Sequence, residues 1–144
     1  MSEIKVDTLT GKTSAGDITV TSEGGAATQS LQQGLAKVWC NFEQTATHTV
    51  RDSLNISSLN DDGAGLTDTN YTSSFSNDDY VAGGHASKYS DTNENAYWLF
   101  PVRATAVYST SSTSWSSGYS SGTGSAMGLI DLSVNLCTIH GDLA

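Results

Sequence analysis

Positive charge is scarce in this sequence. Only six of its 144 residues are lysine or arginine, against fifteen aspartates and glutamates, and the formal net charge is -9. Because six cationic side chains can neutralise only a small number of phosphates, the composition argues against nucleic-acid binding. An anionic membrane surface is disfavoured for the same reason. We also find no apolar run long enough to span a membrane, and no signal peptide at the start.

Cysteine and proline are equally sparse. Cys40 and Cys137 lie far apart in strand-like apolar surroundings, where cysteine usually acts as a small hydrophobe. Because proteins made in the cytosol seldom keep disulfides, we expect two free thiols; a disulfide between them is the minor alternative. Neither cysteine has a partner at metal-ligand spacing, so we expect no metal and no cofactor. Pro101 interrupts an apolar run and predicts a strand edge, start or bulge there.

Motifs for catalysis are missing as well. The three histidines are isolated in sequence, and no phosphate-binding glycine pattern or His-Glu-x-x-His motif occurs. The acidic stretch Asn60–Gly63, together with Asp68, offers oxygen ligands for Ca²⁺, but it lacks the spacing and final glutamate of an EF-hand loop. A solvated turn is the better interpretation. We therefore expect no catalytic residue and no enzyme.

Apolar and aromatic residues nevertheless indicate a packed core, since hydrophobic residues make up 37% and include three Trp, six Tyr and three Phe. The pattern divides the chain into three parts. Residues 1–27 predict an extended arm with two short alternating runs, whose apolar side chains are Ile4, Val6, Ile18 and Val20. An isolated hairpin is marginal in water, so this attachment arm needs another surface to lie on.

Residues 28–38 predict a short helix. Ser30 and Gln33 have the spacing of a capping box, and Leu31, Leu35 and Val38 fall on one face. A helix of under three turns is not stable alone. Its apolar stripe is therefore expected to contact copies of itself around a symmetry axis, or to pack on the following domain.

Residues 39–144 predict a β-rich head. Short alternating runs recur between turns rich in Gly, Asn and Asp, as at Ser76–Asp79, which is typical of an antiparallel sandwich. The run 129–139 predicts a strand. Its core face would hold Ile130, Leu132, Val134 and Leu136, and its hydrated face Asp131, Ser133 and Asn135. The predicted fold is mainly β: a jelly-roll-like antiparallel β-sandwich after an arm and one short helix.

The segment Ser109–Ser125 differs from the rest of the head because it is almost entirely small and hydroxylic, apart from Trp115 and Tyr119. Its composition predicts a flexible loop. Aromatic rings in a Ser/Gly frame are typical of recognition surfaces, so these two residues are the candidate receptor contacts. Alternatively, they pin a long loop onto the sandwich.

Several stretches resemble a known group of proteins. They are residues 4–20 (IKVDTLTGKTSAGDITV), residues 31–37 (LQQGLAK) followed by Trp39, residues 51–58 (RDSLNISS) and the ending HGDLA. Together they are similar to small virion-associated and tail-fibre-like proteins of marine bacteriophages, especially cyanophages. The resemblance is strongest up to about Gly65 and weak between 89 and 127. It implies a trimeric particle component, assembled in the host cytoplasm, with its N-terminal part attached to the phage head or tail and its C-terminal part outward.

Three functions follow as expectations. The first is a fibre or spike protomer that joins other phage structural proteins through residues 1–38 and presents its head to a host surface glycan or protein. The second is a capsid decoration or cement protein. The third is a free carbohydrate-binding module, in which Trp98, Trp115 and Tyr119 would stack on sugars.

Overall fold

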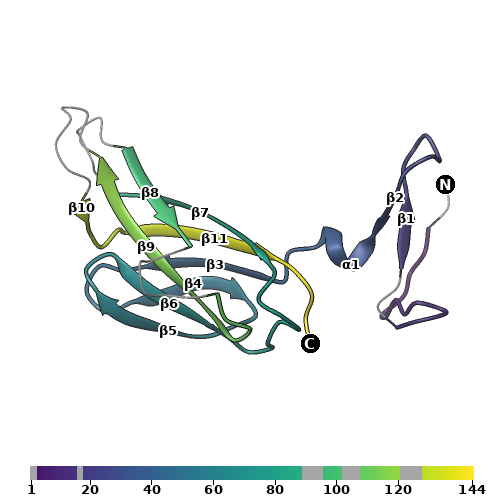
Figure 1. Cartoon of the computed structure of the whole chain (residues 1–144), viewed down its shortest axis with the longest axis horizontal. Helices are drawn as coiled ribbons and strands as arrows, with labels where there is room; N and C mark the ends of the chain where they lie inside the picture. The colour runs from purple at the N-terminus through teal and green to yellow at the C-terminus, as the bar shows by residue number, and fades with distance from the viewer. Residues whose placement is uncertain (1–2, 16–17, 89–95, 102–107, 121–127) are drawn as a thin grey trace. The chain divides into compact units, whose positions relative to one another are not determined.

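The computed structural model describes residues 3–15, 18–88, 96–101, 108–120 and 128–144. It divides the chain into two compact units, Met1–Leu35 and Ala36–Ala144, called here the N-terminal unit and the β unit. Each unit is described by itself. The strands of both units are labelled in Figure 1.

The N-terminal unit holds one small hairpin and one helical turn. Strand β1 (Thr19–Thr21) pairs with antiparallel β2 (Thr28–Ser30), and α1 (Leu31–Gly34) follows directly. The predicted cap is confirmed, because the backbone N–H of Gln33 donates to the Ser30 hydroxyl at 3.4 Å. Residues 4–6, which the structure describes, form no strand, so the first of the two predicted runs was wrong.

The predicted short helix is present, but its predicted bounds of 28–38 were wrong, because α1 spans only Leu31–Gly34. Leu35 has extended backbone angles, φ -96° and ψ 141°, and Val38 already belongs to the β unit, where it is fully buried. Glycine weakens a helix by about 1 kcal/mol relative to alanine. Burial of Val38 in a sheet therefore outweighs the helical spacing of the three apolar residues.

The β unit contains two antiparallel sheets (Figure 1). The first has the order β4-β3-β11-β7. Its strands are β3 (Val38–Glu43), β4 (Thr49–Leu54), β7 (Val81–Ser87) and β11 (Val134–His140). The second has the order β10-β9-β6-β5, with β8 also paired to β9. Its strands are β5 (Ile56–Gly63), β6 (Leu66–Tyr71), β8 (Ala96–Phe100), β9 (Ser112–Ser120) and β10 (Gly128–Leu129). The predicted mainly β, antiparallel character is confirmed.

Both sheets contribute to one hydrophobic core. The first sheet provides Val38, Cys40, Phe42, Cys137 and Ile139, and the second provides Tyr71, Leu99 and Trp115. An aromatic row joins Tyr71 to Phe75 (ring centroids 5.3 Å apart), Phe75 to Tyr80 (4.7 Å) and Tyr80 to Tyr108 (5.0 Å).

The predicted loop at Ser109–Ser125 was wrong over Ser112–Ser120, which form the nine-residue strand β9; residues 121–125 lie outside the described residues. Thr113, Trp115 and Ser117 all point to the interior and are at most 1% exposed. Their alternation was masked by the serines that separate them. Pairing with β6 and with β8 satisfies the backbone of this segment, so the ladder overrides a composition typical of flexible loops.

The expected faces of the C-terminal strand were wrong from Ser133 onward. Leu132 is fully buried as predicted, but Leu136 is 41% exposed, whereas Ser133 and Asn135, expected on the hydrated face, are buried. The regular strand begins only at Val134. Residues 130–133 lie outside it, and this irregular stretch shifts the alternation by one residue.

Candidate functional site

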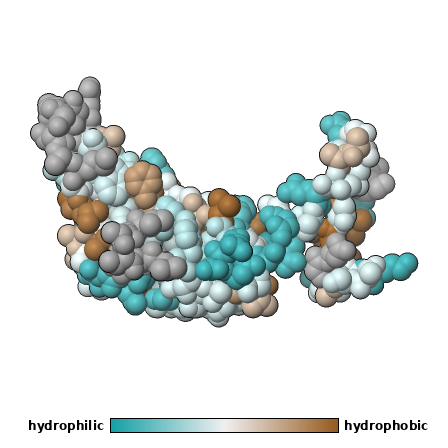
Figure 2. Space-filling model, in the orientation of Figure 1, coloured by the Kyte–Doolittle hydropathy of each residue, from teal (hydrophilic) through white to brown (hydrophobic). Residues whose placement is uncertain are grey.

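Exposed apolar side chains gather on the N-terminal unit. Ile4 is 83% exposed, Leu9 60%, Val6 56%, Leu35 55% and Val20 49%; these five residues are called the arm surface. Figure 2 shows hydrophobic residues on the visible face of this unit. The cause is its size, because a hairpin of two three-residue strands and a four-residue helix have no second layer to cover them. None of the four residues of α1 is buried.

Part of this unit forms an apolar hollow of about 240 Å³, lined by Leu9, Ala15, Ile18, Leu31, Gln32 and Leu35. The structure thus brings together three predicted site residues, Ile18, Leu31 and Leu35. Val20 lines a neighbouring hollow that also includes Leu31 and Leu35. Val38 is absent from both, because it lies in the core of the β unit.

Leu9 belongs to this surface, although the sequence did not predict it. Its signal was weak, because Leu9 stands alone among Asp7, Thr8 and Thr10 and belongs to no alternating run. A backbone hydrogen bond from Gly11 N to the Ala15 carbonyl, 3.0 Å long, closes the turn that follows Leu9.

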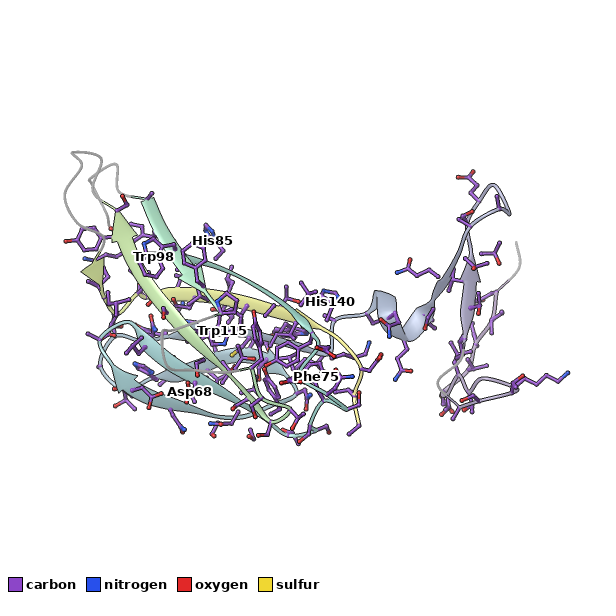
Figure 3. All side chains as sticks on the ribbon, in the orientation of Figure 1. Asp68, Phe75, His85, Trp98, Trp115 and His140 are labelled. Carbon is purple, nitrogen blue, oxygen red and sulfur yellow. The ribbon has the colours of Figure 1, made fainter. Side chains whose placement is uncertain are left out.

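Trp115 was proposed as a receptor contact, and this prediction was wrong. Its side chain is fully buried, and its indole N–H donates to the Thr69 hydroxyl at 3.0 Å. Figure 3 shows it among the interior side chains of the β unit. Tyr119 lies on the same side of β9, half-buried, opposite Tyr97 of β8 and Gly128 of β10. Trp115 therefore holds the two sheets together and is not available to a ligand.

A different aromatic pair stands on the outer face of the second sheet. Trp98 and Phe100 alternate with the buried Leu99, and their rings stack with centroids 5.2 Å apart and planes 26° apart. Phe100 is 56% exposed. Gly118 lies directly opposite Trp98, and a side chain there would collide with the indole ring. The missing side chain is what lets the ring lie across β9.

The sheet around this pair is polar and short-chained. Outward-facing neighbours on β9 and β6 include Ser114 and Asn70, and Asn70 Nδ2 donates to the Ser58 hydroxyl at 3.0 Å. The described positions of these strands carry no lysine or arginine. A stacked aromatic pair beside hydroxyl and amide groups favours a neutral, hydroxylated ligand over an anionic one.

Polar side chains also form a chain inside the β unit. Fully buried Gln44 donates from Nε2 to the Thr67 hydroxyl (2.9 Å), and its Oε1 accepts from the Ser117 hydroxyl (2.7 Å) and from the backbone N–H of Leu132 (3.1 Å). His48 Nδ1 lies 3.1 Å from the same Thr67 oxygen. This network supplies the backbone of the irregular stretch before β11 with the partners that a strand would otherwise provide.

A carboxylate completes the row, with Asp61 Oδ1 3.5 Å from His48 Nε2. The hydroxyl, imidazole and carboxylate thus follow one another, and Thr67 is fully buried. The row is suited to holding β5 and β6 against the β3–β4 connection. Among the described residues, no three His, Cys, Asp or Glu side chains gather closely enough to hold a metal ion.

In the part of the chain that the structure describes, no helix is long and apolar enough to cross a bilayer. Comparison of the chain with protein-family models, with curated proteins and with solved structures finds no match. The surfaces above therefore carry the functional argument.

Proposed function

We propose that this chain is a structural subunit of a bacteriophage particle, a fibre or spike protomer that assembles as a homotrimer. The N-terminal unit attaches to other phage proteins, and the β unit faces outward as a jelly-roll-like sandwich. The exposed arm surface carries the proposal, because five large apolar side chains between 49% and 83% exposed are costly in a monomer. The proposal that the particle is a phage virion rests on the resemblance of residues 4–20 and 31–37 to phage virion proteins.

A three-fold arrangement would cover the exposed apolar side chains of the N-terminal unit. Each copy would offer the same hollow, lined by Leu9, Ile18, Leu31 and Leu35, to its neighbours, and symmetry would supply the layer that one chain lacks. Burial of apolar surface stabilises by about 25 cal/mol per Å². The assembly would thus gain the stabilisation from apolar burial that the isolated hairpin lacks.

Sedimentation of the full chain tests the proposal. The wild type should sediment as a trimer at micromolar concentration, whereas Leu9→Ser/Leu31→Ser/Leu35→Ser should sediment as a monomer with the same near-ultraviolet circular dichroism. Val81→Ser is the matched control, because Val81 is equally apolar and 75% exposed but lies on the β unit. If the wild type sediments as a monomer, the proposed assembly is refuted. If Val81→Ser also sediments as a monomer, the contact between copies does not depend specifically on the arm surface.

Incorporation into particles separates the phage role from other homo-oligomers. Virions assembled with the triple serine variant should lack this chain, and those assembled with Val81→Ser should retain it. If the triple variant is incorporated normally, attachment does not run through the N-terminal unit. A chain located between capsomers, with its arm along them, would instead favour a capsid decoration or cement protein.

The outward aromatic pair favours a second candidate function, glycan contact. Trp98→Ala/Phe100→Ala should reduce adsorption of phage to host cells while leaving folding and incorporation unchanged, and Leu136→Ala is the control because Leu136 is exposed on the other sheet. Unchanged adsorption would retire this candidate. Binding of the purified chain to sugars without any particle would favour a free carbohydrate-binding module.

A further inference from the structure

Cys40 and Cys137 are 97 residues apart in the sequence (137 − 40) but directly opposite each other in the first sheet. The register of β3 and β11 is continuous around them, with Asn41 opposite Leu136 and Trp39 opposite Thr138. We propose that these two cysteines form an intramolecular disulfide on oxidation by a low-molecular-weight disulfide such as oxidised glutathione. This bond would join the first strand of the β unit to its last.

The backbone spacing suits the bond. Directly opposite residues of antiparallel strands have Cα atoms roughly 4.5–5.5 Å apart, and disulfides bridge Cα atoms roughly 4.4–6.8 Å apart. Both side chains also lie on the same face. Cys40 is 2% exposed and Cys137 6%, and they alternate with outward residues in the same phase as Val38 and Ile139. The two side chains therefore enter the core from directly opposite positions, and the bond requires no change of register.

The environment makes the reaction slow in the folded chain. Burial, and then the nearby Asp52 carboxylate, raises the pKa of the Cys40 thiol to about 12. Burial and the neighbouring Cys40 raise the pKa of Cys137 as well. Since the thiolate is the attacking species, little of it exists at neutral pH. The bond should form readily during folding, and only slowly once β3 and β11 are paired.

The chemistry balances in two exchanges. One cysteine thiolate attacks a sulfur of oxidised glutathione, forming a mixed disulfide and releasing one glutathione thiolate. The second cysteine thiolate then attacks the protein sulfur of that mixed disulfide, forming the Cys40–Cys137 bond and releasing a second glutathione. The two cysteines are oxidised together, and one glutathione disulfide is reduced to two thiols.

Oxidative refolding of the full chain tests this proposal. Denatured, reduced protein is refolded with oxidised and reduced glutathione, and with reduced glutathione alone as the reference. The oxidised product should lack free thiols, weigh less by two hydrogen atoms, and yield one proteolytic peptide pair linked through Cys40 and Cys137. Its Tm should exceed that of the reduced chain by on the order of 10 °C, because a loop of this length is closed.

A register-shifted variant is the sharpest control. Cys40→Ala/Asn41→Cys moves the thiol one residue along β3, to the outer face, and this chain should give only glutathione adducts. Should that variant fail to fold, Cys137→Ala keeps Cys40 in place and should likewise give only an adduct. The proposal is overturned if the oxidised wild type keeps two thiols, accumulates adducts, or links its cysteines between chains.

Discussion

The fully buried Gln44 side chain makes three hydrogen bonds in the interior of the β unit. Replacing it by alanine removes the acceptor of the Leu132 N–H, the donor to Thr67 and one partner of the Ser117 hydroxyl. Ser117 keeps the Ile130 carbonyl as a second partner at 2.9 Å, and Thr67 keeps His48. The backbone N–H of Leu132, a fully buried residue, loses Gln44 Oε1 as its acceptor.

The expected loss follows from these contacts. A buried donor left without its partner costs about 1–3 kcal/mol, and truncation of a buried side chain adds about 2 kcal/mol or more for the cavity. Gln44→Ala should therefore lower the free energy of unfolding by about 3–5 kcal/mol. Gln44→Met keeps most of the volume and removes only the hydrogen bonds, so its loss should be about 1–3 kcal/mol.

Urea unfolding followed by tryptophan fluorescence measures this loss. Trp39, Trp98 and Trp115 all belong to the β unit, so the signal reports that unit alone. The variants are compared at one protomer concentration, because assembly would add stability. Ser57→Ala serves as the exposed control and should change stability by less than about 0.5 kcal/mol. If Gln44→Met is as stable as this control, the network does not stabilise the interior.

Three further results are expected. Leu132→Ala should cost about 2–5 kcal/mol in urea unfolding and Leu136→Ala less than about 1 kcal/mol; equal losses would contradict the observed faces. Trp115→Ala should cost about 3–5 kcal/mol by the same assay, whereas a fully stable variant with weakened adsorption would make Trp115 a surface contact after all. Because burial raises the pKa of Cys40 from 9.0 to about 12, the folded chain holds this proton more tightly than the unfolded chain. The contribution of the Cys40 thiol to the free energy of unfolding is fully present below about pH 9. It decreases by about 1.4 kcal/mol per pH unit as the pH rises from about 9 toward 12. Cys137, whose pKa burial also raises, adds its own contribution above about pH 9. Cys40→Ala should therefore reduce the measured slope by about 1.4 kcal/mol per pH unit without abolishing it, and an unchanged slope would show that the Cys40 thiol does not titrate with folding.

Local chemistry explains what could be predicted from the sequence. The Ser30 cap involves residues three apart, and the turn at Ser76–Asp79 follows from Asn and Asp side chains that bond their own backbone, as Asn77 does to the Asp79 N–H at 3.0 Å. The mainly β class follows from short alternating runs between such turns. These features need no knowledge of distant partners.

Features that depend on distant partners were missed or wrong. The break between β4 and β5 lies at Asn55, whose φ of 61° and whose side-chain hydrogen bonds with the Ser73 backbone turn the chain from one strand into the other. The sequence offers Asn as a residue that tolerates this conformation, but the anchoring partner is 18 residues away.

The sequence by itself determined the composition of this protein's surfaces: few cations, many hydroxyls, and a short apolar N-terminal stretch that cannot form a core alone. Only the tertiary structure decided which aromatic residues face outward and that Cys40 lies directly opposite Cys137. Trp115 and Trp98 both lie in alternating runs, yet one is fully buried and the other stands on the outer face. The reason is that a strand's period of two fixes only that neighbours point in opposite directions. Which direction is inward depends on the register of each ladder, and register is a property of two strands together.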